Sequence, residues 1–199
     1  MATTHPDRLH YTGVDEADEL LAREPFALLV GFALDQQVPV QTAFSGPLKL
    51  KQRLGTLEPG KIAATDPGRL QEVFREKPAI HRFPGNMAKR VQDLAVVVVE
   101  DYGGDAATVW TGAKNGADLF KRVQALPGYG KQKAQILVAL LGKQFDVQPQ
   151  GWRAAAGDYG KAGSTLSAAD IVDDASLLRV RAHKKELKAA AKAAKESAE

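Results

Sequence analysis

Apolar residues recur with helical spacing along almost the whole chain, and this periodicity limits the possible folds more than any other feature. Within residues 84–103, for example, Met87, Val91, Leu94 and Val98 fall on one face of a helix. The run of four valines at 96–99 could suggest a strand, but the length and flanking pattern of the segment favour a buried helix. The sequence therefore predicts an all-α protein.

Proline, glycine and short polar residues mark the ends of the predicted helices. We expect helices over about 26–37, 67–76, 117–125 and 131–144, and another between 84 and 103. Gly46-Pro47 should break or kink the helix that restarts after Pro39. Ser167 and Asp170 are spaced as a capping pair for a later helix.

The composition excludes several classes of site. The chain has 199 residues, enough for one core or for two small lobes, and it contains no cysteine. Disulfides, thiolate metal sites, cysteine nucleophiles and cysteine-bound iron–sulfur clusters are therefore excluded. The four histidines are not spaced to share a metal ion, so we expect neither a metal nor an organic cofactor.

The sequence also argues against membrane contact. No segment approaches the roughly 20 consecutive apolar residues that a membrane-spanning helix needs. Residues 1–9 lack the apolar stretch of a secretory signal peptide. We therefore expect a cytoplasmic protein.

Basic residues are unevenly distributed, although the net charge of +3 is small. Residues 119–145 contain no acid and five basic side chains, which are Lys121, Arg122, Lys131, Lys133 and Lys143. A locally positive patch on a nearly balanced protein indicates contact with a polyanion. A solvated charged face is the alternative.

The most informative segment is Leu-Pro-Gly-Tyr-Gly-Lys-Gln-Lys-Ala at 126–134. Gly128 and Gly130 stand between two predicted helices, and glycine allows both a tight turn and close approach of a ligand to the backbone. The second helix begins there with free amides and the positive end of its dipole, which suits a DNA phosphate. Lys131 and Lys133 add positive charge. An ordinary corner between two helices is the alternative.

This segment resembles the helix-hairpin-helix motif, typically Leu-Pro-Gly-x-Gly, which many DNA-binding proteins share. Three further segments make the resemblance more specific: Leu-Asp-Gln-Gln-Val at 34–38, the helix around 86–95, and Val-Gln-Pro-Gln-Gly-Trp-Arg at 147–153. Together they resemble, over roughly 26–153, the helix-hairpin-helix (HhH-GPD, endonuclease III-like) DNA glycosylase superfamily. The family's usual four-cysteine cluster is absent, so the chain resembles a divergent branch without an iron–sulfur cluster.

The resemblance implies a two-lobed helical DNA glycosylase fold with a cleft between the lobes. We expect an N-terminal arm over 1–14, an HhH-GPD-like domain over 15–160 and a helical basic tail over 161–199. The tail is rich in Ala, Lys and Glu and should form an exposed or frayed helix. The expected partner is double-stranded DNA, bound by a monomer, so the protein would be associated with the nucleoid whenever it is bound to DNA.

The resemblance also suggests roles for individual residues in DNA contact. Gln37, or Gln36, would enter the duplex and fill the gap left by a flipped base. Trp152, just before Arg153, would either stack on that base or pack between the lobes. Tyr129 would touch the DNA backbone or pack beneath the hairpin. The hairpin contacts themselves would come from Gly128, Gly130, Lys131 and Lys133.

The chain departs from the family at the catalytic aspartate. Aligned on Val147 and Arg153, that place holds Gln148, and a shift of register would bring Pro149 or Gln150 there instead. None of these is an acid, whereas breaking an N-glycosidic bond develops positive charge on the sugar that a carboxylate stabilises. A glutamine offers a dipole but neither a charge nor a base.

Two routes could compensate for this loss. Asp146 lies in the same connection, and Asp35 stands beside the Gln-Gln pair, so either carboxylate could serve; a solvated or capping role is the alternative for each. Alkylated bases that carry a positive charge also leave without help from an acid. The family's lyase lysine corresponds to Gln132, so we expect no strand cleavage through a Schiff base.

These observations predict a base excision repair protein. The first hypothesis is a monofunctional DNA glycosylase that hydrolyses the N-glycosidic bond of an alkylated, deaminated or mispaired base. The second is a catalytically silent module that binds damaged or distorted DNA, which the Gln148 substitution favours. A helical protein-interaction domain without a role on DNA is a third reading, supported only by the balanced charge.

Overall fold

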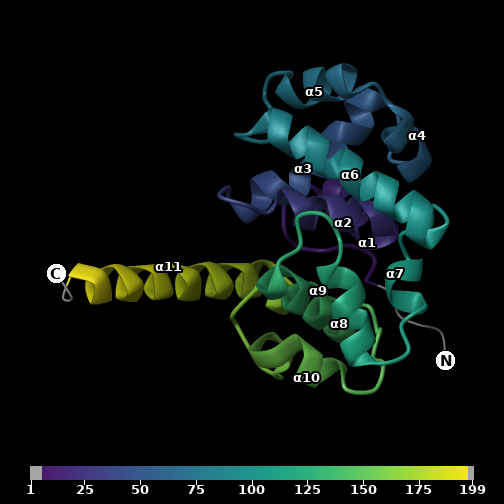
Figure 1. Cartoon of the computed structure of the whole chain (residues 1–199). Coiled ribbons are helices and arrows are strands. Elements are labelled where there is room, and N and C mark those ends of the chain that lie inside the picture. Colours follow the sequence, from purple (N-terminus) through teal and green to yellow (C-terminus); the bar gives the residue numbers. More distant parts are fainter. Residues whose placement is uncertain (1–5, 197–199) are drawn as a thin grey trace.

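The computed structural model describes residues 6–196 and contains α-helices and short 3₁₀ turns, with no β-strand in that range (Figure 1). The α-helices are α1 (Asp15–Arg23), α2 (Pro25–Leu34), α3 (Val40–Leu54), α4 (Pro59–Ala64), α5 (Pro67–Arg75), α6 (Pro84–Tyr102), α7 (Thr108–Thr111), α8 (Gly116–Gln124), α9 (Lys131–Gln144), α10 (Trp152–Ala156) and α11 (Asp174–Glu196). The 3₁₀ turns are η1 (Gly157–Gly160) and η2 (Ala168–Asp170). The all-α prediction is confirmed.

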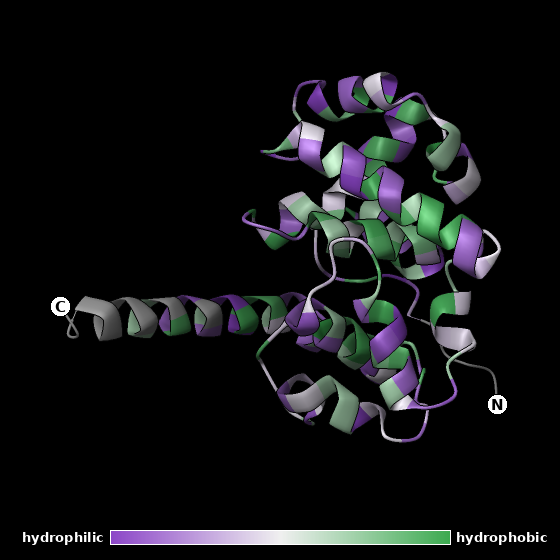
Figure 2. Ribbon diagram, in the orientation of Figure 1, coloured by the Kyte–Doolittle hydropathy of each residue, from purple (hydrophilic) through white to green (hydrophobic). Residues whose placement is uncertain are grey.

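The helices form two lobes. Helices α1–α6 pack against one another in the first lobe, and α7–α10 pack with η1 and η2 in the second. Figure 1 shows the first lobe above the second, with α2 of the first lobe and α9 of the second facing each other across the junction. Hydrophobic residues, green in the ribbon of Figure 2, occur on helices of both lobes, and one continuous hydrophobic cluster extends through both lobes.

Local signals placed several helix ends correctly. The Asp66 side chain accepts a hydrogen bond from the Arg69 amide at the start of α5, as its N-cap position predicts. The valine run lies inside α6, which ends where Gly103 adopts a left-handed conformation. Helix α9 begins and ends at the predicted residues.

At two places the helices differ from the sequence expectations. Helix α2 ends at Leu34 rather than near Gln37, because Asp35 already leaves the helical region with φ −72° and ψ 73°, and Gln37 beyond it is left-handed with φ 56°. Helix α3 continues through Pro47 instead of breaking there. Just before the proline, Gly46 lets α3 pack closely on α2, since a Cβ on it would lie 2.4 Å from Leu34 Cδ1.

The segment after residue 160 packs on the second lobe before the chain leaves it. Ser167 and Asp170 form the expected capping box, which opens η2. Lys143 of α9 pairs with Asp170 at 2.5 Å, and the Tyr11 hydroxyl of the N-terminal arm donates to the Ala168 carbonyl at 2.8 Å. Helix α11 then projects from the body of the protein (Figure 1). No helix within residues 6–196 is both long and apolar enough to cross a membrane.

Candidate functional site

The hairpin between α8 and α9 is a tight turn closed by its own backbone. The Tyr129 amide donates to the Leu126 carbonyl at 3.1 Å, and Gly128 adopts a left-handed conformation with φ 86°. Gly130 is the N-cap of α9, and no side chain in the described part of the protein caps this helix. The amides of its first turn are therefore available to an anion, at the positive end of the helix dipole.

Tyr129 faces inward rather than toward solvent. The side chain is buried, and its hydroxyl donates to the Leu29 carbonyl of α2 at 2.7 Å. Lys133, one turn into α9, places its Nζ 3.4 Å from the Ala33 carbonyl of the same helix α2. Two residues of the hairpin segment therefore fasten the second lobe to α2 of the first lobe.

Replacing Tyr129 with Phe should lower the free energy of unfolding by about 1 kcal/mol, because the Leu29 carbonyl loses a buried hydrogen-bond partner. The midpoint of thermal unfolding, followed by circular dichroism, should fall by roughly 2–4 °C. Tyr159→Phe is the matched control, since that hydroxyl bonds only the exposed Gln132 amide among the described residues, and it should leave stability within about 0.5 kcal/mol. A weaker duplex affinity in Tyr129→Phe without a change in stability would instead assign Tyr129 to DNA contact.

The Gln36-Gln37 loop is held in place by a buried histidine. His81 Nε2 donates to the Gln36 carbonyl at 3.1 Å, while its Nδ1 accepts from the Phe83 amide at 3.0 Å. The neutral ring with its proton on Nε2 serves both bonds. Burial lowers the pKa of His81, which favours this neutral form. Sequence reasoning missed His81, because a lone histidine in a loop carries no signal of its partner.

Arg90 of α6 joins this loop to the hairpin. Its Nη1 donates to the side-chain oxygen of Gln36, and its aliphatic part lies on Gly128 so closely that a Cβ there would be 2.5 Å from Arg90 Cδ. No carboxylate among residues 6–196 forms a salt bridge with Arg90. Within that range, a cation without an ion-pair partner therefore stands between the two elements predicted to contact DNA, and sequence reasoning missed it as well.

Lys131 and Lys133 differ in their surroundings although they are two residues apart. Lys131 is exposed, whereas Lys133 is half-buried and lies over the Tyr129 ring with Nζ 5.8 Å from its centre. Burial lowers the pKa of Lys133 to about 8, while the charge of nearby Asp35 acts in the opposite direction. Lys133 is therefore charged at pH 7 and loses its charge as the pH rises through about 8, well below the range in which an exposed lysine titrates.

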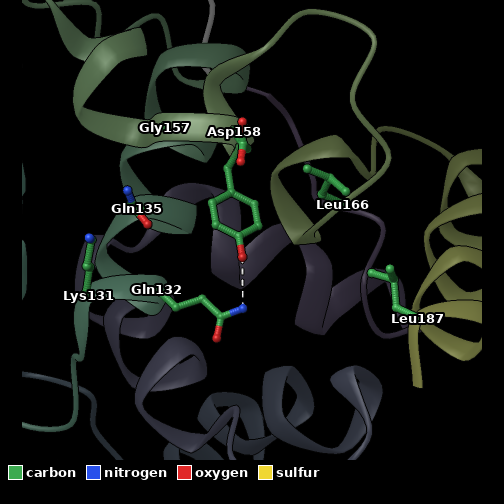
Figure 3. Close-up of a pocket in the computed structure, with 8 residues that line it drawn as sticks. Lys131, Gln132, Gln135, Gly157, Asp158, Leu166 and Leu187 are labelled. Atoms are coloured by element: carbon green, nitrogen blue, oxygen red, sulfur yellow. Dashed lines mark hydrogen bonds between the residues drawn. The ribbon is translucent and has the colours of Figure 1, made fainter. Parts of the chain in front are cut away.

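A pocket opens beside the first turns of α9 (Figure 3). Helix α9 forms one side of the pocket with Lys131, Gln132 and Gln135. The opposite side is formed by Leu166 and by Leu187 of α11, and η1 completes the lining with Gly157, Asp158 and Tyr159. Gln132 Nε2 donates to the Tyr159 hydroxyl at 2.8 Å across the pocket, the dashed line in Figure 3.

Asp158 is the one carboxylate that lines this pocket within the described residues. It pairs with Lys161 at 2.6 Å, and both side chains are largely exposed. The hydrogen bond from Lys161 is the main cause that lowers the pKa of Asp158, so the group is ionised at neutral pH. Sequence reasoning missed both Asp158 and Tyr159, which lie beyond the segment that resembles the family's catalytic region.

The two catalytic candidates that the sequence suggested after α9 lie near the C-terminal end of that helix, whereas the pocket lies beside its first turns. The Gln148 side-chain amide donates to the Gly142 carbonyl at 2.8 Å, and Asp146 is exposed with a left-handed φ of 55°. Gly142 stands ten residues after Gln132, or about 15 Å along the helix. The structure therefore does not bring Gln148 into contact with the pocket beside Gln132.

Trp152 and Arg153 occupy packed positions near this same end of α9. The Trp152 ring is buried against Gly142, where a Cβ would lie 2.3 Å from the ring. The Arg153 guanidinium stacks 4.4 Å from the centre of that ring and donates to the Gly160 carbonyl at 2.8 Å. These contacts connect α10 to α9 and hold η1, so both residues shape the pocket wall from outside it.

A family model described as HhH-GPD superfamily base excision DNA repair protein matches residues 30–199. The match reaches past residue 153, so it includes the C-terminal segment that we expected to lie outside the resemblance. No curated protein and no solved structure matches the chain.

Proposed function

Because the chain belongs to the HhH-GPD superfamily of base excision DNA repair proteins, we propose that it is a monofunctional DNA glycosylase that hydrolyses the N-glycosidic bond of a damaged base. The observation that carries this proposal is the pocket at the first turns of α9, directly beside the hairpin. A phosphate held at the hairpin would place the neighbouring nucleotide at the mouth of a concave site, which is the arrangement that base excision requires.

The proposed DNA contacts surround the junction of the two lobes. The backbone at Gly128 and Gly130, with Lys131, would hold a phosphate without reading sequence. Gln36 and Gln37 would enter the duplex from the loop after α2. Lys133, which is half-buried, would add positive charge next to the bound phosphate.

Arg90 would connect the two groups of contacts, since it reaches both Gln36 and the hairpin. Binding of a phosphate beside Gly128 would give this guanidinium an anionic partner, which no described residue supplies as an ion pair. Trp152 and Arg153 would act indirectly, by fixing α10 and η1 against α9.

The pocket has the chemistry that holds a flipped base. The Tyr159 ring and the two leucines offer apolar surfaces for stacking, and the amides of Gln132 and Gln135 offer hydrogen bonds to the edges of a base. Gln132 also explains why we propose hydrolysis without strand cleavage. Its amide cannot form a Schiff base, and the amine of Lys133 is directed toward the Ala33 carbonyl of α2. Lys131 also lines the pocket, and we assign its amine to the phosphate at the hairpin.

Single-turnover excision on end-labelled duplexes tests the proposal. Each duplex would carry one lesion from a panel of uracil, hypoxanthine, an oxidised purine, methylated purines and an adenine mispair, with protein well above DNA. We expect strand cleavage at one class of lesion after alkali treatment and none without alkali, which is the signature of a glycosylase without lyase activity. Cleavage without alkali would contradict the monofunctional assignment.

A second candidate function is a silent module that recognises damaged DNA. The observation that favours it is Gln148, which replaces the family's aspartate and is bonded to the Gly142 carbonyl. Absence of cleavage on every duplex, together with tight and salt-sensitive binding to lesion DNA, would support this candidate against the glycosylase.

A further inference from the structure

We propose that Asp158 is the catalytic carboxylate of this protein, acting from η1 on the deoxyribose of a nucleotide held in the pocket beside Gln132. This inference rests on the proposed glycosylase function. It names a residue that the family resemblance does not assign, because the position aligned with the family's aspartate holds Gln148.

The chemistry requires a negative charge close to the sugar. In hydrolysis, the C1′–N bond breaks with its electron pair leaving on the base, which takes up a proton from solvent. Water then adds to C1′ and gives up a proton, to the carboxylate or to solvent. Positive charge develops on the sugar between these events, and an ionised carboxylate beside the pocket stabilises it.

The placement of carboxylates in the structure selects Asp158. Among the residues described, it is the only acid that lines the pocket. The same pocket contains the groups suited to hold a base. Asp146 follows the C-terminal end of α9, about 15 Å of helix from the pocket. Asp35 follows α2 and acts electrostatically on Lys133, which extends toward the first lobe rather than into the pocket.

The backbone explains how Asp158 comes to this place. Gly157 adopts a left-handed φ of 60°, and a Cβ on it would lie 2.8 Å from the Gln135 side-chain nitrogen. This glycine therefore lets η1 approach α9 closely enough for the next two residues, Asp158 and Tyr159, to line the pocket. Lys161 keeps the Asp158 carboxylate ionised while leaving it exposed at the pocket mouth.

The test is Asp158→Asn, which keeps the shape of the side chain and removes its charge. We expect the single-turnover excision rate to fall about 10²–10³-fold, the usual effect of losing one well-placed electrostatic group. The Kd for the lesion duplex should stay the same or decrease, because the variant loses a negative charge and keeps every group that binds phosphate. Asp158→Glu should recover part of the rate, since it restores the carboxylate.

The matched control, Asp146→Asn, removes a carboxylate that the sequence suggested and that does not line the pocket. It should excise at close to the rate of the unmodified protein. If the unmodified protein excises a lesion and Asp158→Asn does so equally fast, the assignment of Asp158 is wrong while the glycosylase function stands. If the unmodified protein excises no lesion, the proposed function fails and this inference fails with it.

Discussion

Gly116→Ala is expected to lower the free energy of unfolding by about 2–3 kcal/mol, although it adds a single methyl group. A Cβ at this position would lie 2.4 Å from the Trp152 amide nitrogen, and 2.5 and 2.6 Å from the carbonyl carbon and oxygen of Gly151. These are backbone atoms, which cannot rotate away as a flexible side chain could. The midpoint of thermal unfolding should fall by roughly 5–10 °C.

The close approach at Gly116 matters because it joins α8 to the turn that begins α10. The Gly116 amide donates to the Gln150 carbonyl at 2.8 Å, so the start of the hairpin's first helix is bonded to that turn. The chain then continues through α10 to η1, which lines the pocket. A shift at this joint is therefore expected to displace Asp158 and Tyr159 as well as to lower stability.

Gly60→Ala is the matched control for this prediction. Gly60 lies in α4, and a Cβ there would meet no atom within 4 Å. The variant should be as stable as the unmodified protein or more stable by about 0.5–1 kcal/mol, since alanine favours helix. Equal unfolding midpoints for Gly116→Ala and the unmodified protein would show that α8 and α10 do not approach as closely as the structure has them.

Much of the fold could be predicted because its signals are local. The Asp66-Pro67 pair, the glycine at 103 and the hairpin glycines each act within one or two turns of backbone, and the structure has helix ends at all of them. The end of α2 and the continuity of α3 could not be predicted in this way. Neither has a signal of its own in the neighbouring sequence, and the two helices meet where Gly46 packs on Leu34, a contact between segments that the sequence does not show.

The residues of the candidate site show the same difference between local signals and contacts made across the fold. The hairpin was visible in the sequence as a contiguous segment of nine residues at 126–134. His81 and Arg90 were not, because each meets its partner only after the chain folds: His81 bonds Gln36 across 45 positions, and Arg90 bonds Gln36 across 54. Asp158 was not visible either, because folding alone brings it to the pocket that α9 lines. No spacing rule links residues so far apart, and the position that resembles the family's catalytic aspartate holds Gln148, which does not point to the pocket.

Replacing both Lys131 and Lys133 with Ala should weaken binding to every duplex, whatever its sequence or lesion. If both lysines bind phosphates, the slope of log Kobs against log salt should become shallower by about 0.9 for each lysine removed. Lys61→Ala is the matched control, since it removes one positive charge from α4, outside the hairpin and its neighbours, and should leave the slope unchanged. An unchanged slope in the double variant would remove the hairpin from the DNA interface.

The low pKa of Lys133 should make DNA binding depend on pH, and this dependence distinguishes the contribution of Lys133 from that of Lys131. A lysine is charged below its pKa, so Lys133, with a pKa of about 8, is protonated at pH 7 and largely neutral at pH 9.5, whereas exposed Lys131 has no comparable burial. Bound phosphate favours the charged form, so binding near pH 8 should take up a proton. The salt slope of the unmodified protein should therefore become shallower by up to about 0.9 between pH 7 and pH 9.5.

Lys133→Met tests whether this pH dependence belongs to Lys133, since it keeps the apolar stem over Tyr129 without a group that titrates. Its salt slope should already be shallow at pH 7 and should not change by pH 9.5, whereas Lys131→Ala should retain the pH dependence of the unmodified protein. If Lys133→Met keeps the pH dependence, Lys133 only fastens the lobes together through the Ala33 carbonyl, and the phosphate contacts come from Lys131, Arg90 and the hairpin amides.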